Sequence, residues 1–218
     1  MRGMVKKIWP NSTVFVIGGG PSIVGQDLCL PPVGGRYGIE AYLQKQHVLG
    51  VNNAVYLGPC VDVLFFGDAK WYWWNKKAVQ NFPGPKYTLN KGTKYGHKSV
   101  ENEKGVVTLV KRQHKGLFLK DRGGLAWNRS SGAAAVNVAI HLGAKRIVLL
   151  GFDMRNINGQ KNFLRHEQEN TKPNPYVNFI GGFHWIARAA MIAGVKIWNA
   201  TPGSALPYFD RLELKDLV

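Results

Sequence analysis

Acidic residues are scarce in this chain of 218 amino acids. It has 13 Asp and Glu against 29 Lys and Arg, so its formal net charge is +16 at pH 7. A balance so far from neutrality disfavours a cationic partner and favours an anionic one, with DNA or another nucleic acid as the first choice. The excess is concentrated between Lys70 and Arg129, where 14 Lys and Arg stand against three Asp and Glu. A solvated basic surface without a dedicated partner is the alternative explanation.

Cysteine is nearly absent as well, with only Cys29 and Cys60. Two cysteines outside a C-x-x-C pair exclude a disulfide framework and predict a reducing, cytoplasmic setting. No apolar run approaches the roughly 20 residues of a membrane span, and residues 1–10 lack the apolar core of a signal peptide. The chain also lacks a D-x-D pattern and a Cys/His cluster with metal-ligand spacing. We therefore expect no membrane span and no metal site.

The most informative stretch runs from Thr13 to Ser22. Thr13–Ile17 is β-branched or aromatic throughout, which is typical of a buried strand, and Gly18, Gly19 and Gly20 follow it. A turn without side chains lets backbone N–H groups approach a phosphate. The spacing matches neither G-x-G-x-x-G nor the Walker loop. A tight turn that needs glycine only for its geometry is therefore the alternative.

Strands and helices alternate along the chain. We expect strands at 13–17, 47–51, 61–66, 86–89, 106–112, 146–150 and 195–199, and helices at 23–30, 39–46, 70–81, 130–142 and 182–193. This order predicts an α/β, Rossmann-like fold, with a mostly parallel sheet and helices on both faces. We expect a single nucleotide-donor-binding domain over residues 1–218. It would carry a small basic, aromatic-rich insertion at about 70–129.

Small or polar residues follow the strands. They are Gly18 to Ser22, Asn52-Asn53, Asp68, Asp153 and Thr201 to Ser204. Because the carboxyl ends of parallel strands meet at one edge of a sheet, these groups are expected to form one polar site. The alternative is that loops are polar wherever they lie.

Four sequence blocks resemble the bacterial sialyltransferases that use CMP-sialic acid, and their relatives. These relatives include motility-accessory factors, archaeal hydroxymethylpterin pyrophosphokinases and phage-encoded proteins. The blocks are V-I-G-G-G-P-S (Val16–Ser22), N-N-A-V-Y (Asn52–Tyr56), the stretch Arg129–Asp153, and a last one from F-I-G-G-F-H (Phe179–His184) to Thr201–Leu206. They span most of the chain in the family's order. If the chain is phage-encoded, its cytoplasmic setting is that of the host.

The resemblance implies a site for a nucleotide-activated donor, such as a nucleotide sugar, without a metal. The implied donor-binding positions are Gly19, Gly20, Ser22, Asn53, Ser130, Ser131 and Gly132, and the strand-end pattern adds Gly18 and Asp68 to the expected donor site. Backbone N–H groups and a helix N-terminus favour an anion, which agrees with this role. For Ser130 and Ser131, ordinary helix capping is the alternative.

Three further residues are candidates for catalysis. Asp153 ends the G-x-D of the third block, and its alternative role is to tie down its own loop. Arg155 stands where the sialyltransferases carry a tyrosine that steadies the leaving phosphate, and a guanidinium suits that role. His184 is the match to the family's general base, and a histidine can deprotonate a hydroxyl near neutral pH. Lys161, Arg165 and His166 lie on the same polar loop as Arg155, as auxiliary or reserve candidates.

The sequence leaves three functions open. The first is a glycosyltransferase-like transfer from a nucleotide-activated donor to a hydroxyl, with hydroxylated bases of phage DNA as a candidate acceptor. The second is a Mg²⁺-dependent pyrophosphokinase acting on a pterin-like alcohol, with Asp68 and Asp153 at the metal. The third is a non-catalytic nucleic-acid-binding protein. For DNA contact the candidates are Lys94, Lys98, Lys111 and Arg112, and the aromatic residues between Trp71 and Trp127 can instead pack a lid or a homo-oligomer interface.

Overall fold

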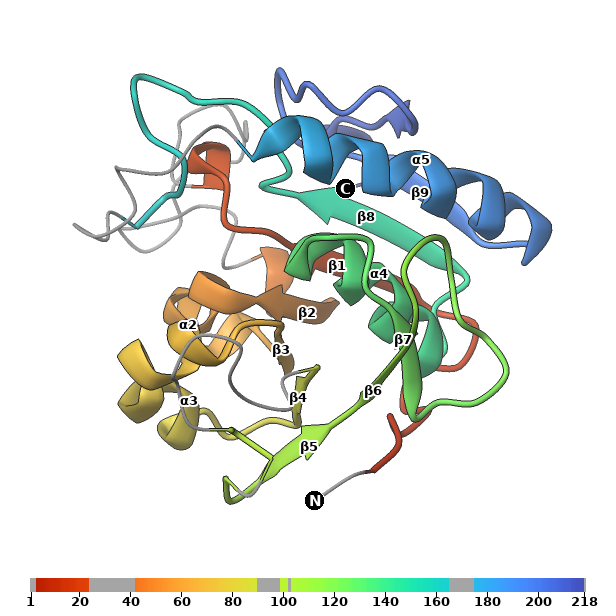
Figure 1. Ribbon diagram of the computed structural model, residues 1–218. Coiled ribbons are helices and arrows are strands. Elements are labelled where there is room, and N and C mark those ends of the chain that lie inside the picture. Colours follow the sequence, from red (N-terminus) through yellow and green to blue (C-terminus); the bar gives the residue numbers. More distant parts are fainter. Residues whose placement is uncertain (1–2, 24–41, 90–98, 102, 165–174, 218) are drawn as a thin grey trace.

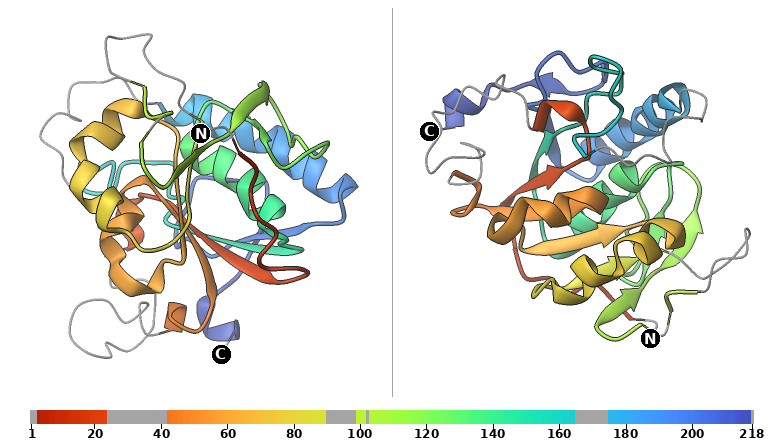
Figure 2. Two further views of the ribbon diagram at one scale, coloured as in Figure 1. Left: turned by 90° about the horizontal axis from the view of Figure 1, so that it is seen from below. Right: turned by 90° about the vertical axis from the view of Figure 1, so that its left-hand side faces the viewer.

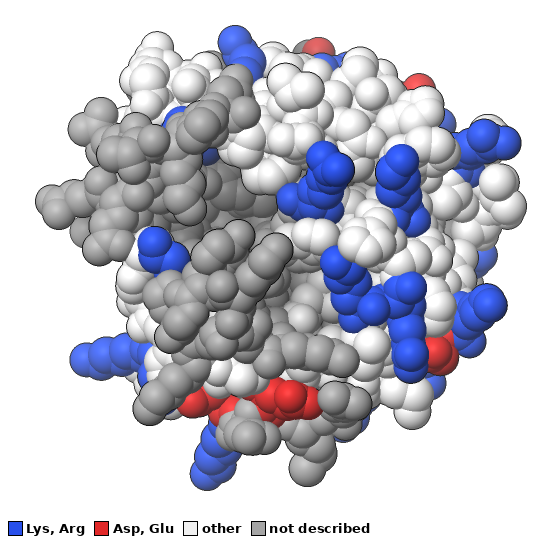
Figure 3. Space-filling view, viewed as in Figure 1, with Lys and Arg blue, Asp and Glu red and all other residues white. Residues whose placement is uncertain are grey.

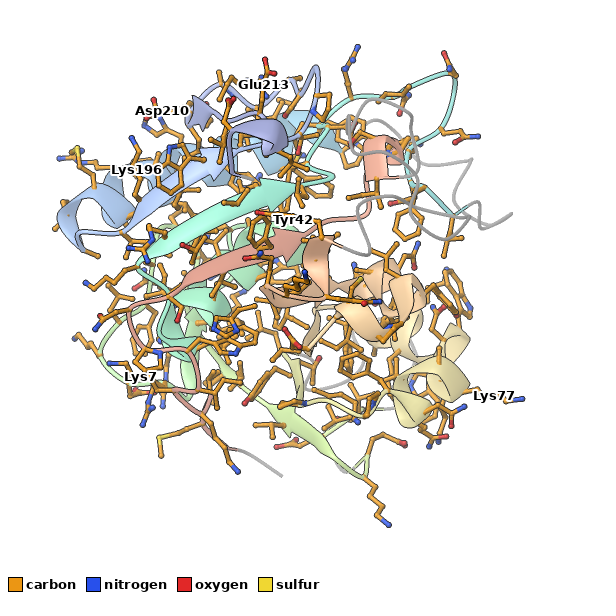
Figure 4. All side chains as sticks on the ribbon, turned by 180° about the vertical axis from the view of Figure 1, so that it is seen from behind. Lys7, Tyr42, Lys77, Lys196, Asp210 and Glu213 are labelled. Atoms are coloured by element: carbon orange, nitrogen blue, oxygen red, sulfur yellow. The ribbon has the colours of Figure 1, made fainter. Side chains whose placement is uncertain are left out.

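The computed structural model describes residues 3–23, 42–89, 99–101, 103–164 and 175–217. Eight strands form one sheet in the order β10-β9-β8-β1-β2-β3-β4-β5, and every neighbouring pair is parallel. The strands are β1 (Thr13–Ile17), β2 (His47–Val51), β3 (Val63–Phe66), β4 (Lys86–Thr88), β5 (Val106–Thr108), β8 (Arg146–Leu150), β9 (Lys196–Asn199) and β10 (Asp210–Arg211). Lys196 and Asp210 form an ion pair that joins β9 to the edge strand β10 (Figure 4).

Helices cover both faces of this sheet, as Figures 1 and 2 show. One face carries α4 (Ser131–Leu142) and α5 (Tyr176–Ile192), and the other carries the 3-10 helix η3 (Asn52–Cys60), α2 (Ala69–Trp74) and α3 (Lys76–Asn81). Short 3-10 helices also form at Pro21–Ile23 and Leu214–Leu217. The expected α/β, Rossmann-like class is therefore confirmed.

The two cores follow from the alternation of side chains along each strand. On β1, Val14 and Val16 pack against α4, while Phe15 and Ile17 face the other core. Because successive residues point to opposite faces, a strand buried on both sides must be apolar throughout. That is the reason why β1 and β8 are readable in the sequence as continuous apolar runs.

The basic segment 70–129 is built differently from the expected insertion. Its strands β4 and β5 extend the main sheet, and only β6 (Val110–Gln113) and β7 (Gly124–Ala126) form a separate two-stranded sheet. The expected strand at 106–112 is therefore two strands. The part of the segment that lies apart from the main sheet is smaller than expected.

Two expected helices have different bounds in the structure. The helix expected at 70–81 is broken at Asn75, whose side-chain amide donates to the Trp71 carbonyl and so ends α2. The helix expected from Gly182 begins earlier, at Tyr176. A Cβ on Gly182 would lie 2.4 Å from the Asn128 carbonyl oxygen, so this glycine serves a close contact and does not mark a helix end. The expected helices at 23–30 and 39–46 lie largely outside the described residues.

The described residues also bear on membranes and metals. None of the helices among them has the length and apolarity that crossing a bilayer requires. Their His, Cys, Asp and Glu side chains nowhere gather in groups of three or more that would hold a metal ion.

A fully buried side chain on α4, Asn137, fixes the small sheet to the main core. Its Oδ1 accepts from Phe118 N (2.8 Å) and Ala126 N (3.1 Å), and its Nδ2 donates to Phe118 O (3.0 Å). Buried backbone groups need such partners because an unsatisfied group costs free energy. Asn137 therefore attaches β7 and the preceding loop to α4.

Replacing this asparagine should destabilise the protein. Asn137→Ala leaves the N–H and C=O of the half-buried Phe118 and the N–H of the buried Ala126 without the partner they have now, and we expect the free energy of unfolding to fall by about 3 kcal/mol. Asn81→Ala, at an exposed position that ends α3, is the matched control and should change it by less than about 0.5 kcal/mol. Urea unfolding of both variants measures this, and equal small changes would contradict the assigned role.

Candidate active site

The sheet order places a crevice between β1 and β8. From β1 the chain builds outward through β2, β3, β4 and β5, then returns through α4 to β8 on the other side of β1. At such a switch point the loops beyond the two strands diverge, and in open α/β sheets the ligand binds there. The residues at this point are the glycine turn after β1 and the segment Gly151–Asp153 after β8.

A pocket of about 220 Å³ lies at this switch point. Segments 18–20, 51–53, 130–132 and 151–154 line it, together with Trp71 and four side chains further along the chain: Lys161, Asn162, Tyr176 and Phe179. The carboxyl ends of β1, β2 and β8 and the N-terminus of α4 therefore converge, which agrees with the strand-end pattern for three of its five segments. The other two segments, Asp68 and Thr201–Ser204, do not line the pocket. Asn53 and Ser131 line this cavity, whereas Ser22 does not line it and is buried next to it, where its hydroxyl donates to Asp153.

The glycine turn offers a ligand fewer free backbone N–H groups than its three glycines suggest. Gly18 N donates to Leu150 O (2.7 Å) and Gly20 N donates to Gly151 O (2.9 Å). Of the three glycines, only Gly19 has an N–H that donates to no described group. A Cβ on Gly18 would lie 2.6 Å from the Gly151 carbonyl oxygen. The main task of this turn is therefore close contact with the chain after β8.

The N-terminus of α4 supplies the larger set of donors. Ser130 is its N-cap, with the hydroxyl accepting from Ala133 N (3.1 Å), while Ser131 and Gly132 form the first turn. The first N–H groups of a helix lack intrahelical acceptors and carry partial positive charge. Ser130 therefore has the capping role that the alternative expects, and both serines line the pocket, where their role toward a ligand stays a prediction.

A strained backbone sets the position of this helix end. Asn128 (φ 50°) and Arg129 (φ 64°) both have left-handed conformations, which asparagine tolerates and arginine adopts at a cost. Asn128 Oδ1 accepts from Gly116 N (2.7 Å) and its Nδ2 donates to Gly116 O (2.9 Å). Arg129 donates to Asn178 Oδ1 on α5 (2.8 Å). These contacts fix where the first turn of α4 points.

Asp153 also lines the pocket and is buried, with 2% of its surface exposed. Its Oδ2 accepts from the Ser22 hydroxyl (2.9 Å), and its buried Oδ1 has no partner among the described residues. Burial raises the pKa of this carboxyl, and the bond from Ser22 opposes that shift in part. An unpartnered oxygen beside a cavity is an acceptor for a ligand donor. The alternative role, tying down the loop, holds together with this one, because Ser22 takes only one of the two oxygens.

The second strand contributes a pair of asparagines. Asn53 Oδ1 accepts from the Trp71 indole N–H (2.7 Å), which makes that ring a fixed wall of the pocket. Asn52 has φ 51°, and its buried Oδ1 has no partner among the described residues. The pocket thus pairs amide donors at α4 with oxygen acceptors at Asn52 and Asp153.

Besides Ser22, three predicted donor-binding or catalytic residues lie outside this lining. Asp68 is exposed and caps α2 by accepting from Lys70 N (2.8 Å). Arg155 is exposed and packs over Gly203, where a Cβ would lie 2.6 Å from its Nη2. His184 is exposed on α5, with its ring 5.4 Å from that of Tyr208. Arg155 and His184 therefore both contact the loop of residues 201–209.

Of the remaining candidate residues, some lie in the part of the chain that the structure describes and others do not. Lys111 and Arg112 are exposed on β6, and Lys161 lines the pocket. Lys94, Lys98, Arg165 and His166 lie outside the described residues. Sequence reasoning missed Asn162 on the loop after β8 and Tyr176 and Phe179 on the first turn of α5, because neither spacing nor composition shows that these segments line the same pocket as the glycine turn. The only signal was the F-I-G-G block, which begins at Phe179.

Comparison with known proteins places the fold. No protein-family model matches the chain, and no curated protein matches it in sequence. The MAf glycosyltransferase from Magnetospirillum magneticum AMB-1 superposes with a TM-score of 0.62 at 13% identity, over 99% of this chain and 35% of that one. The sialyltransferase CstII from Campylobacter jejuni, in complex with cytidine-5'-monophosphate, does so with a TM-score of 0.57 at 17% identity, over 94% of this chain and 86% of CstII. The chain has the sialyltransferase-like fold.

The expected resemblance is thereby confirmed at the level of the fold. A further CstII structure, with a trisaccharide acceptor and CMP, matches with a TM-score of 0.53. The chain spans about a third of the length of the MAf glycosyltransferase, which is a much larger protein. At these identities the comparison concerns the fold, and the roles of the individual site residues stay predictions.

The contact between Gly20 and Asp153 is directly testable. A Cβ on Gly20 would lie 1.7 Å from Asp153 Oδ2, so Gly20→Ala must displace the carboxylate or the turn. We expect it to lower the free energy of unfolding by about 2 kcal/mol. Gly181→Ala is the matched control: nothing lies within 4 Å of its Cβ, and an added helix former should raise stability by about 0.5 kcal/mol. Thermal unfolding distinguishes the two, and a neutral Gly20→Ala would contradict the close contact.

Proposed function

We propose that the chain is a glycosyltransferase-like enzyme that takes a group from a nucleotide-activated donor and transfers it to a hydroxyl. The observation that carries this proposal is the pocket at the switch point, which the N-terminus of α4 and the buried Asp153 both line. It lies in a fold shared with glycosyltransferases, two of whose structures contain CMP. In the proposed mode the donor phosphate binds the first-turn N–H groups at Ser131 and Gly132 and the N–H of Gly19.

The acceptor side chains that line the same pocket suit the sugar or base part of the donor. Asn52 Oδ1 and Asp153 Oδ1 are buried acceptors without described partners, and ligand O–H or N–H groups would satisfy both. The Trp71 ring, held by Asn53, offers a flat apolar surface between them. The donor would therefore be recognised by its anionic phosphate at one end and by its hydrogen-bond donors at the other.

The transfer breaks the bond between the donor carbon and its phosphate oxygen and forms a bond from that carbon to the acceptor oxygen. The electron pair leaves with the phosphate, and the acceptor proton passes to a base. Arg155 and His184 keep these roles as proposals, because both contact the loop of residues 201–209. For Arg155 and His184 to act in these roles, the reacting end of the donor must extend from the pocket toward that loop. The scheme routes no step through a metal.

The structure supports the two alternative functions and the proposed DNA acceptor to different degrees. A Mg²⁺-dependent pyrophosphokinase would need Asp68 and Asp153 at one site, but Asp68 is an exposed cap of α2 and does not line the pocket. Hydroxylated DNA bases as the acceptor, or plain nucleic-acid binding, draw support from the exposed Lys111 and Arg112 on β6. We therefore keep DNA as the proposed acceptor and give the pyrophosphokinase no role in the mechanism.

Calorimetry with CMP, UDP, GDP, their sugar conjugates and nucleoside triphosphates tests the donor site. We expect at least one nucleotide to bind, and Ser131→Glu to weaken it at least about tenfold, because a carboxylate repels the phosphate at the helix end. Ser99→Glu, an exposed serine far along the chain from the pocket lining, is the control of equal charge. The absence of any binding at about millimolar concentration, or an unchanged affinity in Ser131→Glu, would overturn the proposal.

A further inference from the structure

A continuous basic face extends from β6 across the outer side of α5. We call it the α5–β6 face and define it by the exposed cations Lys111, Arg112, Lys115, Arg129 and Arg188 with the ring of Trp185. Figure 3 shows Lys and Arg gathered over this side of the molecule, with little acidic surface between them. Five cations on one side, drawn from segments far apart in sequence, form a surface that no single sequence run reveals.

Among the described residues, no carboxylate forms an ion pair with a cation of this face. The ion pairs of this part of the chain are Lys76–Glu103 and Lys196–Asp210. α5 contains no acidic residue at all, and between Val110 and Arg129 the only one is Asp121. Exposed cations without carboxylate neighbours keep their full attraction for an external anion.

An exposed aromatic ring lies in the middle of the face. Trp185 is 40% exposed, and the Lys115 ammonium lies 4.7 Å from its ring centroid. A ring next to a cation is the combination with which proteins hold a single-stranded nucleic acid, because bases stack on the ring while phosphates meet the charge.

The face begins at the mouth of the pocket. Arg129 directly precedes the α4 cap Ser130 and donates to Asn178 Oδ1 (2.8 Å), and the first turn of α5 lines the pocket through Tyr176 and Phe179. From there α5 continues for 17 residues, or roughly 25 Å at about 1.5 Å per residue. A small anion would contact only a short part of this length, whereas a polymer with regularly spaced charges would contact the face along all of it.

We propose that the α5–β6 face binds single-stranded nucleic acid and leads it toward the pocket. That the strand is also the acceptor rests on the proposed function; that it binds here does not. A base in a single strand can leave its stack and enter a pocket, whereas a paired base cannot. An anionic membrane is the competing occupant, because α5 also exposes the apolar side chains of Val177, Trp185, Met191 and Ile192, and the experiment below separates the two.

Fluorescence anisotropy with a labelled oligothymidylate of about 20 nucleotides tests this proposal. The triple variant Arg112→Glu, Lys115→Glu, Arg188→Glu should bind at least about tenfold more weakly. Its log–log salt slope should fall by about 2, at about 0.7 for each lost phosphate contact. Trp185→Ala should weaken binding about tenfold through lost stacking and leave the salt slope unchanged.

The matched control carries the same charge change elsewhere. Lys7, Lys45 and Lys77 are exposed and lie outside the face, as Figure 4 shows for Lys7 and Lys77. Replacing all three by Glu should change the affinity by less than about threefold, because exposed charges are screened beyond roughly 8 Å at physiological salt. Circular dichroism and thermal unfolding check that both triple variants are folded.

Four outcomes decide the matter. No binding of the oligonucleotide by the native chain, or equal losses in both triple variants, overturns the proposed face. Tighter binding of vesicles that contain phosphatidylserine, lost in the face variant while oligonucleotide binding persists, also overturns it in favour of a membrane. Binding of the oligonucleotide at this face, without any nucleotide binding by calorimetry, supports the face while the proposed transferase fails.

Discussion

A single buried carboxylate at the junction of β1 and β8 constrains the rest of the site. Asp153 has 2% of its surface exposed, accepts from Ser22, and lies where a Cβ on Gly20 would stand 1.7 Å away. Keeping a charge-bearing group out of water is costly, so its neighbours must satisfy it and approach it closely. Gly18 and Gly20 are needed because the two strand ends meet here backbone to backbone. The other oxygen, Oδ1, is buried without a partner among the described residues, in a residue that lines the pocket.

The second requirement is a fixed helix end at the same pocket as that carboxylate. α4 begins at Ser131 because Ser130 caps it, and the left-handed Asn128 and Arg129 aim its first turn at the pocket. Asn128 and Asn137 join the same helix to the β6–β7 region through the backbone of the segment around Gly116 and Phe118. The donor pocket and the α5–β6 face are thus parts of one arrangement around α4. In the account proposed here, a donor bound at the helix end and a strand held along α5 meet at its first turn.

The predictable parts of this protein are those decided by local sequence. β1, β2 and β8 have the predicted bounds because each is an apolar run between breaking residues, and α4 follows its serine cap. The convergence at one edge follows from parallel strands alone. The break at Asn75, the early start of α5 and the pairing of β6 with β7 depend on contacts between distant residues. So do the positions of Arg155 and His184 beside the loop of residues 201–209, which sequence spacing does not encode.

Backbone amide shifts measured by NMR during a titration with CMP, or with whichever nucleotide calorimetry selects, test the central claim most directly. If a phosphate binds at the α4 N-terminus, in the pocket that Asp153 also lines, the largest shifts appear at Gly19, Ser131 and Gly132. The amide of Ala139, in the buried middle of α4, then changes little. Shifts confined to β6 and α5, with those three amides unmoved, would contradict the account.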